Sequence, residues 1–257
     1  MYIDIHAHLF EPYFKNIEEA VKNAEKAGVM IVVVNGLNRT TNREVLTLAK
    51  KYRIVKAALG IYPTEAVEKK FLSNQEYKTE GLNVDEELTF IKKNKQHIVA
   101  IGEVGLDYQE ITEKTQQQGA FKKLIQLAEE INKPLIIHSR KAEEDVVNIL
   151  EQERARKVIM HCFSGKKALI KKIKDNGWYC SIPTTIVRSS HFQELVKLMP
   201  ISQLFCETDT PFLSPYKEVT NQPAYIIESY KKIAEIKGLT LEEVKNIIFM
   251  NWQKLFL

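Results

Sequence analysis

Eight short runs of β-branched and apolar residues, separated by longer segments of helical period, constrain the fold of this chain most strongly. The runs cover residues 2–5, 29–34, 54–59, 97–101, 134–137, 157–160, 178–182 and 204–206. Spread over 257 residues, eight units average roughly 32 residues each. Regular alternation of strand and helix is typical of a parallel sheet, and eight such units predict an α/β (β/α)8 TIM barrel.

Helical signals between the runs support this prediction. Apolar residues follow one helical stripe over residues 17–27, and Gly28 stands where a C-terminal glycine belongs. Thr240 and Glu243 have the spacing of a capping box that opens a last helix. No Gly-, Ser- or Pro-rich linker divides the chain, so residues 1–257 are expected to form a single domain. The alternative is a doubly wound open sheet, which binds its ligand at one switch point.

Composition narrows the class of protein. The longest clean apolar run, residues 29–34, is far shorter than the roughly 20 residues that span a bilayer. No secretory leader is recognised at the N-terminus. Three cysteines without C-x-x-C spacing argue against a disulfide framework and fit the cytoplasm. A net charge of +4 is too small to indicate nucleic-acid binding by itself. The connection over residues 64–83 is unusually long, and we expect it to flank the active-site mouth.

Four of the six histidines terminate predicted strands: His6, His8, His138 and His161. Taken singly, each has an ordinary interpretation as an exposed or core histidine. Residues i and i+2 of a strand point to the same side, so His6 and His8 can form a metal-binding pair. In a barrel the strand ends that carry these four histidines converge on one face, which favours a metal site. The other two, at positions 97 and 191, are assigned to the scaffold.

Carboxylates follow two of the same strands. Glu103 comes after the fourth run, between Gly102 and Gly105, which we expect to let the backbone turn tightly. Without a partner, Glu103 would instead cap a helix or pair with a lysine. Glu207 and Asp209 follow the last run at i and i+2, so they are expected to share a face. Downstream of Glu103, residues 107–108 (Asp-Tyr) are expected to shape the loop.

Four imidazoles and at least two carboxylates are too many ligands for one catalytic zinc, which takes about three from the protein. They suit two divalent cations with Glu103 as the bridge, an arrangement that activates water for attack on phosphorus or a carbonyl. Mixed nitrogen and oxygen ligands favour Zn²⁺, Mn²⁺ or Fe²⁺ over Mg²⁺.

Residues beyond these ligands offer contacts for a phosphate. Arg140 stands two residues after His138, and its alternative role is an ion pair with Glu143 or Glu144. Ser164 and Gly165 precede a helix whose N-terminal amides can bind an anion. The lysines at the start of that helix (166, 167, 171 and 172) are predicted to form a solvated face.

Five segments resemble the TatD-type metal-dependent deoxyribonucleases. They are Ile-Asp-Ile-His-Ala-His-Leu (3–9), Ile-Gly-Glu-Val-Gly-Leu-Asp-Tyr (101–108), Ile-Ile-His-Ser-Arg (136–140), His-Cys-Phe-Ser-Gly (161–165) and Glu-Thr-Asp-Thr-Pro-Phe-Leu-Ser-Pro (207–215). The resemblance extends to residues 251–256 and implies a distorted (β/α)8 barrel. It also implies hydrolysis of DNA phosphodiesters, often as a 3′→5′ exonuclease on single strands, with some members incising damaged DNA.

The same resemblance implies which residues bind each cation. The ligands of one cation would be His6, His8, Glu103 and Asp209, and those of the second Glu103, His138 and His161. The chain departs from the family pattern at three positions. Tyr62 replaces a histidine thought to help handle the substrate phosphate, and a phenol cannot become cationic near neutral pH. Lys141 replaces an aspartate beside the site, and Gln222 replaces a common acid.

The leading hypothesis is a two-metal phosphodiesterase acting on DNA, with Asp209 as both ligand and general base. Arg140, Ser164, Gly165 and Tyr62 would contact the substrate. A second hypothesis is an amide or ester hydrolase of the same superfamily, such as an aminoacyl-tRNA deacylase. Relatives of that kind often bridge their metals with a modified lysine, which ranks this hypothesis lower. A third is a binding protein whose metal site is structural and closed to water.

Overall fold

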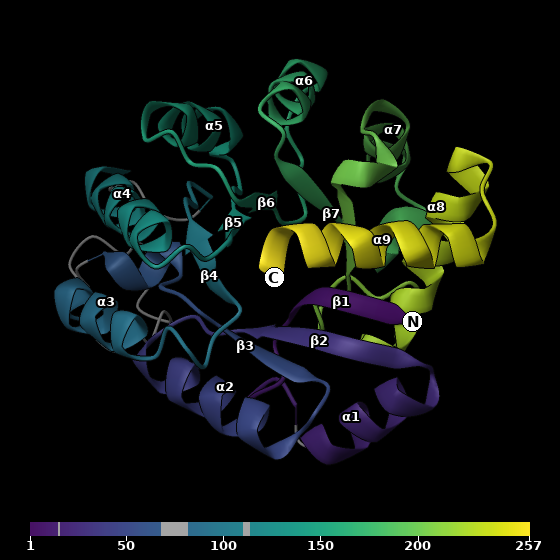
Figure 1. Ribbon diagram of the computed structural model, residues 1–257, viewed down its shortest axis with the longest axis horizontal. Helices are drawn as coiled ribbons and strands as arrows, with labels where there is room; N and C mark the ends of the chain where they lie inside the picture. Colours follow the sequence, from purple (N-terminus) through teal and green to yellow (C-terminus); the bar gives the residue numbers. More distant parts are fainter. Residues whose placement is uncertain (15, 68–81, 110–113) are drawn as a thin grey trace.

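A computed structural model of the chain describes residues 1–14, 16–67, 82–109 and 114–257. Eight parallel strands follow one another around a barrel in sequence order, each paired with the next (Figure 1). They are β1 (Tyr2–Ala7), β2 (Val29–Asn35), β3 (Val55–Leu59), β4 (Ala100–Gly105), β5 (Leu135–His138), β6 (Val158–Met160), β7 (Tyr179–Pro183) and β8 (Leu204–Glu207). This order has no switch point, so the barrel prediction is confirmed and the doubly wound alternative is wrong.

Helices surround the barrel on the outside (Figure 1). They are α1 (Ile17–Lys26), α2 (Arg39–Lys51), α3 (Val84–Lys93), α4 (Lys114–Glu130), α5 (Glu143–Gln152), α6 (Lys167–Asp175), α7 (Ser190–Leu198), α8 (Ile227–Lys237) and α9 (Leu241–Phe256). Gly28 follows α1 with φ +81°, as its predicted place after a helix end requires. The capping box of Thr240 and Glu243 at the start of α9 is confirmed. Most of the long connection after β3, residues 68–81, lies outside the described residues.

The barrel closes between its first and last strands at their carboxyl ends. Ala7 and Thr210 form a parallel bridge. The His8 amide donates to the Thr210 carbonyl at 2.9 Å, and the Asp209 amide donates to the His6 carbonyl at 2.9 Å. These backbone bonds place the end of β1 directly beside the segment that follows β8.

The position of β4 differs from the prediction. The strand begins at Ala100 rather than at residue 97 and continues to Gly105, so Glu103 lies within the strand and not after it. The apolar run ended too early because glycines and a carboxylate occupy the half of the strand nearest the site. Gly102 and Gly105 permit close packing between strands rather than a tight turn. A Cβ at Gly105 would lie 2.0 Å from a carbonyl oxygen of β5.

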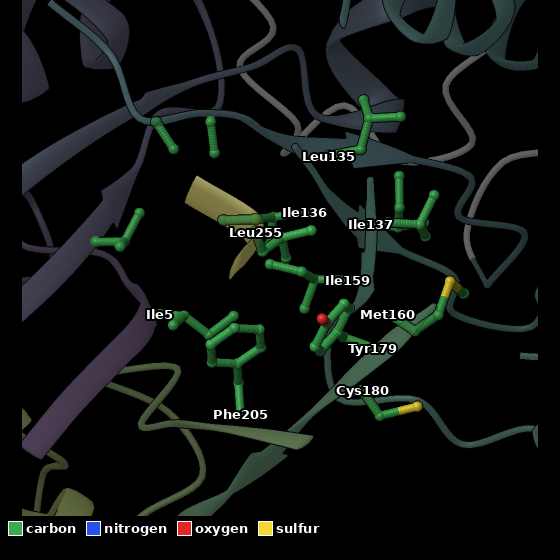
Figure 2. Close-up of a cluster of buried hydrophobic side chains, with 14 of the residues drawn as sticks. Ile5, Leu135, Ile136, Ile137, Ile159, Met160, Tyr179, Cys180, Phe205 and Leu255 are labelled. Atoms are coloured by element: carbon green, nitrogen blue, oxygen red, sulfur yellow. The ribbon is translucent and has the colours of Figure 1, made fainter. Parts of the chain in front are cut away.

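The core fills the inside of the barrel and its amino-terminal mouth. Side chains from different strands, including Ile5, Ile159 and Phe205, meet Leu255 of α9 in one buried cluster (Figure 2). Helix α9 crosses that mouth (Figure 1), and its Asn251 amide donates to the Leu204 carbonyl at 2.9 Å, at the start of β8. One mouth is therefore closed by α9, and the carboxyl ends of the strands form the other.

Tyr230 of α8 ties the outer helical layer to β1. Its buried hydroxyl accepts a hydrogen bond from the Ile3 amide at 2.9 Å and donates one to the Ile3 carbonyl at 3.1 Å. We expect Tyr230→Phe to lower the free energy of unfolding by about 1–3 kcal/mol, because both Ile3 groups lose a buried partner. Chemical denaturation measures this, with the exposed Tyr216→Phe as control. An unchanged free energy of unfolding for Tyr230→Phe would contradict the assignment.

The cysteines and the helices relate to two expectations from composition, on disulfides and on membrane spans. Cys162, Cys180 and Cys206 are all free thiols. Within the part of the chain that the structure describes, no helix is both long and apolar enough to cross a membrane.

Candidate metal centre

Six predicted side chains converge at the open mouth of the barrel. They come from β1, β4, β5 and the residues that directly follow β1, β6 and β8. Five of them line a cleft with a volume of about 630 Å³, and the sixth, His6, lies fully buried behind it. These six side chains are His6, His8, Glu103, His138, His161 and Asp209.

Four of these side chains form a first group around one point. His6 Nε2 and His8 Nε2 are 3.1 Å apart, and both lie 3.4 Å from Glu103 Oε2. Asp209 Oδ1 lies 3.5 Å from His6 Nε2 and 3.4 Å from His8 Nε2. A tetrahedral cation bound at about 2.0–2.1 Å has ligand atoms about 3.4 Å apart, so the group fits one ion. His8 Nδ1 lies 3.2 Å from the Asn35 carbonyl, which leaves Nε2 free to face the group.

Glu103 also takes part in a second group through its other oxygen. Glu103 Oε1 lies 2.8 Å from His138 Nδ1 and 4.0 Å from His161 Nε2. The three ligand atoms lie within 4.8 Å of one another and could hold a cation. Three protein ligands leave a coordination position open, as in catalytic sites. The two oxygens of one carboxylate therefore face two different groups, as a bridging ligand does.

A further carboxylate, that of Glu207, contacts the His161 ring on the side away from the second group. Glu207 Oε2 is 2.8 Å from His161 Nδ1 and accepts a short hydrogen bond from the Ser181 hydroxyl, while Oε1 accepts from the Cys162 amide at 3.0 Å. An acceptor on Nδ1 fixes the tautomer whose Nε2 faces the second group. The expectation that Glu207 and Asp209 share a face assumed that the strand continues to Asp209. Instead β8 ends at Glu207, and Asp209 has a left-handed backbone with φ +54°.

Comparison with known proteins identifies the family. The family model described as "TatD related DNase" matches residues 3–257. The chain belongs to the TatD family of metal-dependent hydrolases. It is 36% identical over 266 residues to "Uncharacterized metal-dependent hydrolase YabD" of Bacillus subtilis, covering 100% of this chain and 99% of the relative. It is 33% identical over 262 residues to human "Deoxyribonuclease TATDN3", covering 99% and 94%.

Solved structures show the same fold. A TatD family hydrolase from Entamoeba histolytica superposes with a TM-score of 0.84 at 23% identity, covering 100% of this chain and 98% of that one. A TatD homologue from Escherichia coli, YJJV, also gives 0.84 at 24% identity, covering 99% and 97%. The distorted barrel implied by the family resemblance is thus confirmed.

The charges of the TatD-family site suit a cation. Burial alone raises the pKa of Glu103, but nearby imidazoles, that of His6 first, lower it well below its ordinary value. Burial alone lowers the pKa of His161, but Glu207 and other carboxylates raise it to about 10. Carboxylates likewise overcome burial and raise the pKa of His8 to about 9. Because a ligating imidazole must be neutral, binding a cation here would release protons.

Asp107 links the second group to the residues predicted to bind substrate. Its Oδ2 accepts from the Tyr62 hydroxyl at 3.0 Å and lies 3.1 Å from His138 Nε2. Arg140 donates to the same oxygen from Nε at 2.8 Å and pairs with it through Nη2 at 2.7 Å. Asp107 also accepts from the Gln109 amide, so the prediction that it shapes the loop is confirmed but incomplete. Its contacts with Arg140 and His138 were not predicted.

Ser164 and Gly165 have different environments. The Ser164 hydroxyl lines the cleft and donates to Glu143 Oε1 at 2.6 Å. Gly165 is buried, and a Cβ there would lie 2.4 Å from the ring of Phe163, so packing explains this glycine. Helix α6 begins two residues later with no side-chain cap. On α6, Lys167 pairs with Glu194, which agrees with the predicted solvated lysine face.

Replacing Glu207 with glutamine tests its contact with His161. We expect kcat to fall about 10- to 100-fold and affinity for one of two cations to weaken, because the amide no longer orients the imidazole as a carboxylate does. Calorimetric metal titration and single-turnover cleavage measure both effects, with Glu194→Gln, a change at a partly exposed glutamate that pairs with Lys167, as control. Wild-type affinity for both cations in Glu207→Gln would show that the contact has no such role.

Proposed function

We propose that this TatD-family protein hydrolyses phosphodiester bonds of DNA and that residues 1–257 act as one catalytic domain. The observation that carries the proposal is Glu103, whose two oxygens face two separate groups of imidazoles. The family includes the human protein named a deoxyribonuclease, which supports DNA as the substrate. We propose single-stranded DNA and 3′→5′ removal of nucleotides as the mode of action.

Two divalent cations would be bound by the six converging side chains. The proposed ligands are His6, His8, Glu103 and Asp209 for one ion and Glu103, His138 and His161 for the other. Four nitrogen ligands favour Zn²⁺ or Mn²⁺, with Mg²⁺ less suited to the site. When bound, such ions lower the pKa of a water and stabilise charge on a phosphate in displacement.

Asp209 is proposed as both ligand and proton acceptor. Its side chain is 14% exposed and lines the cleft, whereas that of His6 is fully buried, so the Asp209 carboxylate is a member of the first group that faces the cleft. Burial alone would raise the pKa of Asp209, but the surrounding imidazoles, that of His161 first, lower it below its ordinary value. Asp209 is therefore ionised and can hold a proton taken from an attacking water.

Residues that line the cleft beyond the metal ligands are proposed to bind the phosphate. The Arg140 side chain is 46% exposed and lines the cleft, and Asp107 fixes its orientation, so its positive charge faces the space where a phosphate would lie. Ser164 adds a hydroxyl to the cleft lining. Tyr62 also lines the cleft, but its hydroxyl is engaged with Asp107, so it acts by shaping the wall rather than by supplying charge. Gly165 is buried and does not line the cleft, so its predicted substrate contact is not part of the proposal.

End-labelled DNA tests the proposal. Metal-loaded protein is incubated with a 5′-labelled single strand, the same strand in a duplex, and a 3′-labelled copy. We expect a ladder that shortens from the 3′ end of the single strand, lost in His6→Ala and kept in His97→Ala, a change at an exposed histidine outside the centre. No cleavage by the wild type, or equal cleavage by His6→Ala, would refute it.

The amide or ester hydrolase remains a second candidate because of Tyr62, which stands where the family has a histidine. Among the described residues that line the cleft none is a lysine, which supports Glu103 over a modified lysine as the bridging ligand. Assays on amide, ester and D-aminoacyl-tRNA substrates beside DNA discriminate between the two functions. Faster turnover of any of these than of DNA would replace the proposed function.

A further inference from the structure

Two exposed aromatic side chains stand at the edge of the cleft beside the first ligand group. Tyr13 is 38% exposed and Phe212 is 48% exposed, and both line the cleft. Their ring centroids are 5.4 Å apart with planes inclined by 72°. The His8 ring lies 6.3 Å from Tyr13 and 6.5 Å from Phe212. Both rings therefore lie directly beside the imidazole of His8, a proposed metal ligand.

The backbone around Phe212 is held in place from several sides. Its amide donates to the Asp209 carbonyl at 2.9 Å, and its carbonyl accepts from the Asn221 amide group at 2.7 Å. The next carbonyl, that of Leu213, accepts from the Thr184 hydroxyl at 2.6 Å. The exposed Phe212 ring is thus carried by a backbone segment that several hydrogen bonds hold in place. A ring held in position before a ligand arrives loses little conformational entropy on binding.

Tyr13 is supported by the segment that follows β1. Its amide donates to the Phe10 carbonyl at 3.0 Å, and its ring lies 5.7 Å from the ring of Phe10. Phe10 is 1% exposed and belongs to the main core. Tyr13 therefore presents one face to the cleft while its neighbour anchors it to the barrel.

The cleft has an aromatic edge and a cationic wall. Tyr13 and Phe212 form the edge beside His8, and Arg140, which also lines the cleft, contacts the same Asp107 oxygen as His138. A nucleotide combines the two matching features, a flat apolar base and an anionic phosphate. A base can stack on an aromatic ring whatever its identity, because every base has a π face.

We propose that Tyr13 and Phe212 form a stacking site for a nucleobase adjacent to the bond that is cleaved. This inference rests on the proposed function and names the part of the substrate that the aromatic pair recognises. A base must leave the duplex stack to reach these rings, so the site selects unpaired strands or frayed ends. It gives affinity without sequence preference.

Substrates with and without bases test the stacking site. The variants are Phe212→Ala, Tyr13→Ala and the conservative Phe212→Trp, with Tyr216→Ala as control. Tyr216 is an equally exposed aromatic residue, at 45%, that packs on Tyr225 outside the cleft lining. Each protein is assayed on a single-stranded oligonucleotide and on an abasic oligomer of the same length and charge.

On the normal strand, we expect KM to rise about 5- to 100-fold in Phe212→Ala, with a smaller change in kcat. Phe212→Trp and Tyr216→Ala keep the wild-type KM, and Tyr13→Ala raises it. On the abasic oligomer, the wild type and the alanine variants have the same KM. A KM that rises equally on both substrates, or on neither, overturns the proposal.

A binding measurement separates failure of the stacking site from failure of the nuclease. Stacking of 2-aminopurine in a single strand on an aromatic ring changes its fluorescence without any cleavage. If the wild type binds this strand through Phe212 but cleaves no DNA, the stacking site stands and the nuclease function fails. If the wild type cleaves normal and abasic strands with the same KM, the nuclease function stands and the stacking site fails.

Discussion

The Glu103→Gln variant is expected to lose about three orders of magnitude or more in kcat for DNA cleavage. The amide keeps one oxygen but replaces the other with a donor and removes the negative charge. Glu103 Oε2 lies 3.4 Å from both His6 and His8, and Oε1 lies 2.8 Å from His138. One ligand group therefore loses its oxygen ligand, and the other keeps only a neutral amide oxygen. We expect fewer than one bound cation per chain by elemental analysis after desalting.

Glu87→Gln is the matched control for this change. Glu87 is another buried glutamate, but it pairs with Arg43 and Asn42 on the outer helices. Its replacement is expected to lower the melting temperature and leave metal content and kcat at the wild-type values. If Glu103→Gln kept both cations and wild-type kcat, Glu103 would not be the bridge.

The Asp209→Asn variant is expected to lose about 100- to 1,000-fold in kcat by a different route. Asp209 Oδ1 lies 3.5 Å from His6 and 3.4 Å from His8, both in the first group, so the second group of Glu103, His138 and His161 keeps its three ligands. An asparagine amide also cannot accept the proton that an ionised carboxylate accepts. We expect one bound cation per chain where the wild type has two.

Elemental analysis and single-turnover kinetics on the same samples distinguish Asp209→Asn from Glu103→Gln. Asp85→Asn serves as the control, because Asp85 is 75% exposed and pairs with Lys123 on the surface. Two cations per chain together with wild-type kcat in Asp209→Asn would contradict both of its proposed roles.

The barrel and the converging side chains were predictable because both depend on local patterns. Eight apolar runs at regular intervals specify alternating strands and helices, and strand ends in such a barrel meet at one mouth. His6 and His8 need only the two-residue repeat of β1 to point the same way. His138 and His161 needed only their places at the ends of apolar runs.

The supporting contacts were not predictable because they depend on pairs of residues far apart in the chain. Glu207 meets His161 across 46 positions, and Asp107 meets Arg140 across 33. No pattern of neighbouring residues indicates such pairs. For Arg140, the only partners considered from the sequence were Glu143 and Glu144, which lie close to it in the chain. The exposed Phe212 was missed for the same reason, since its place beside His8 follows from the closure of β1 against the segment after β8.

Titration of metal-free protein with Zn²⁺ or Mn²⁺, with cleavage of an end-labelled single strand followed at each step, tests the two-cation centre. We expect two equivalents to bind per chain, with full activity reached only at the second. We also expect Glu103→Gln to bind neither ion tightly and to stay inactive throughout. Full activity at one equivalent, or metal-independent cleavage by the wild type, would contradict the two-cation centre.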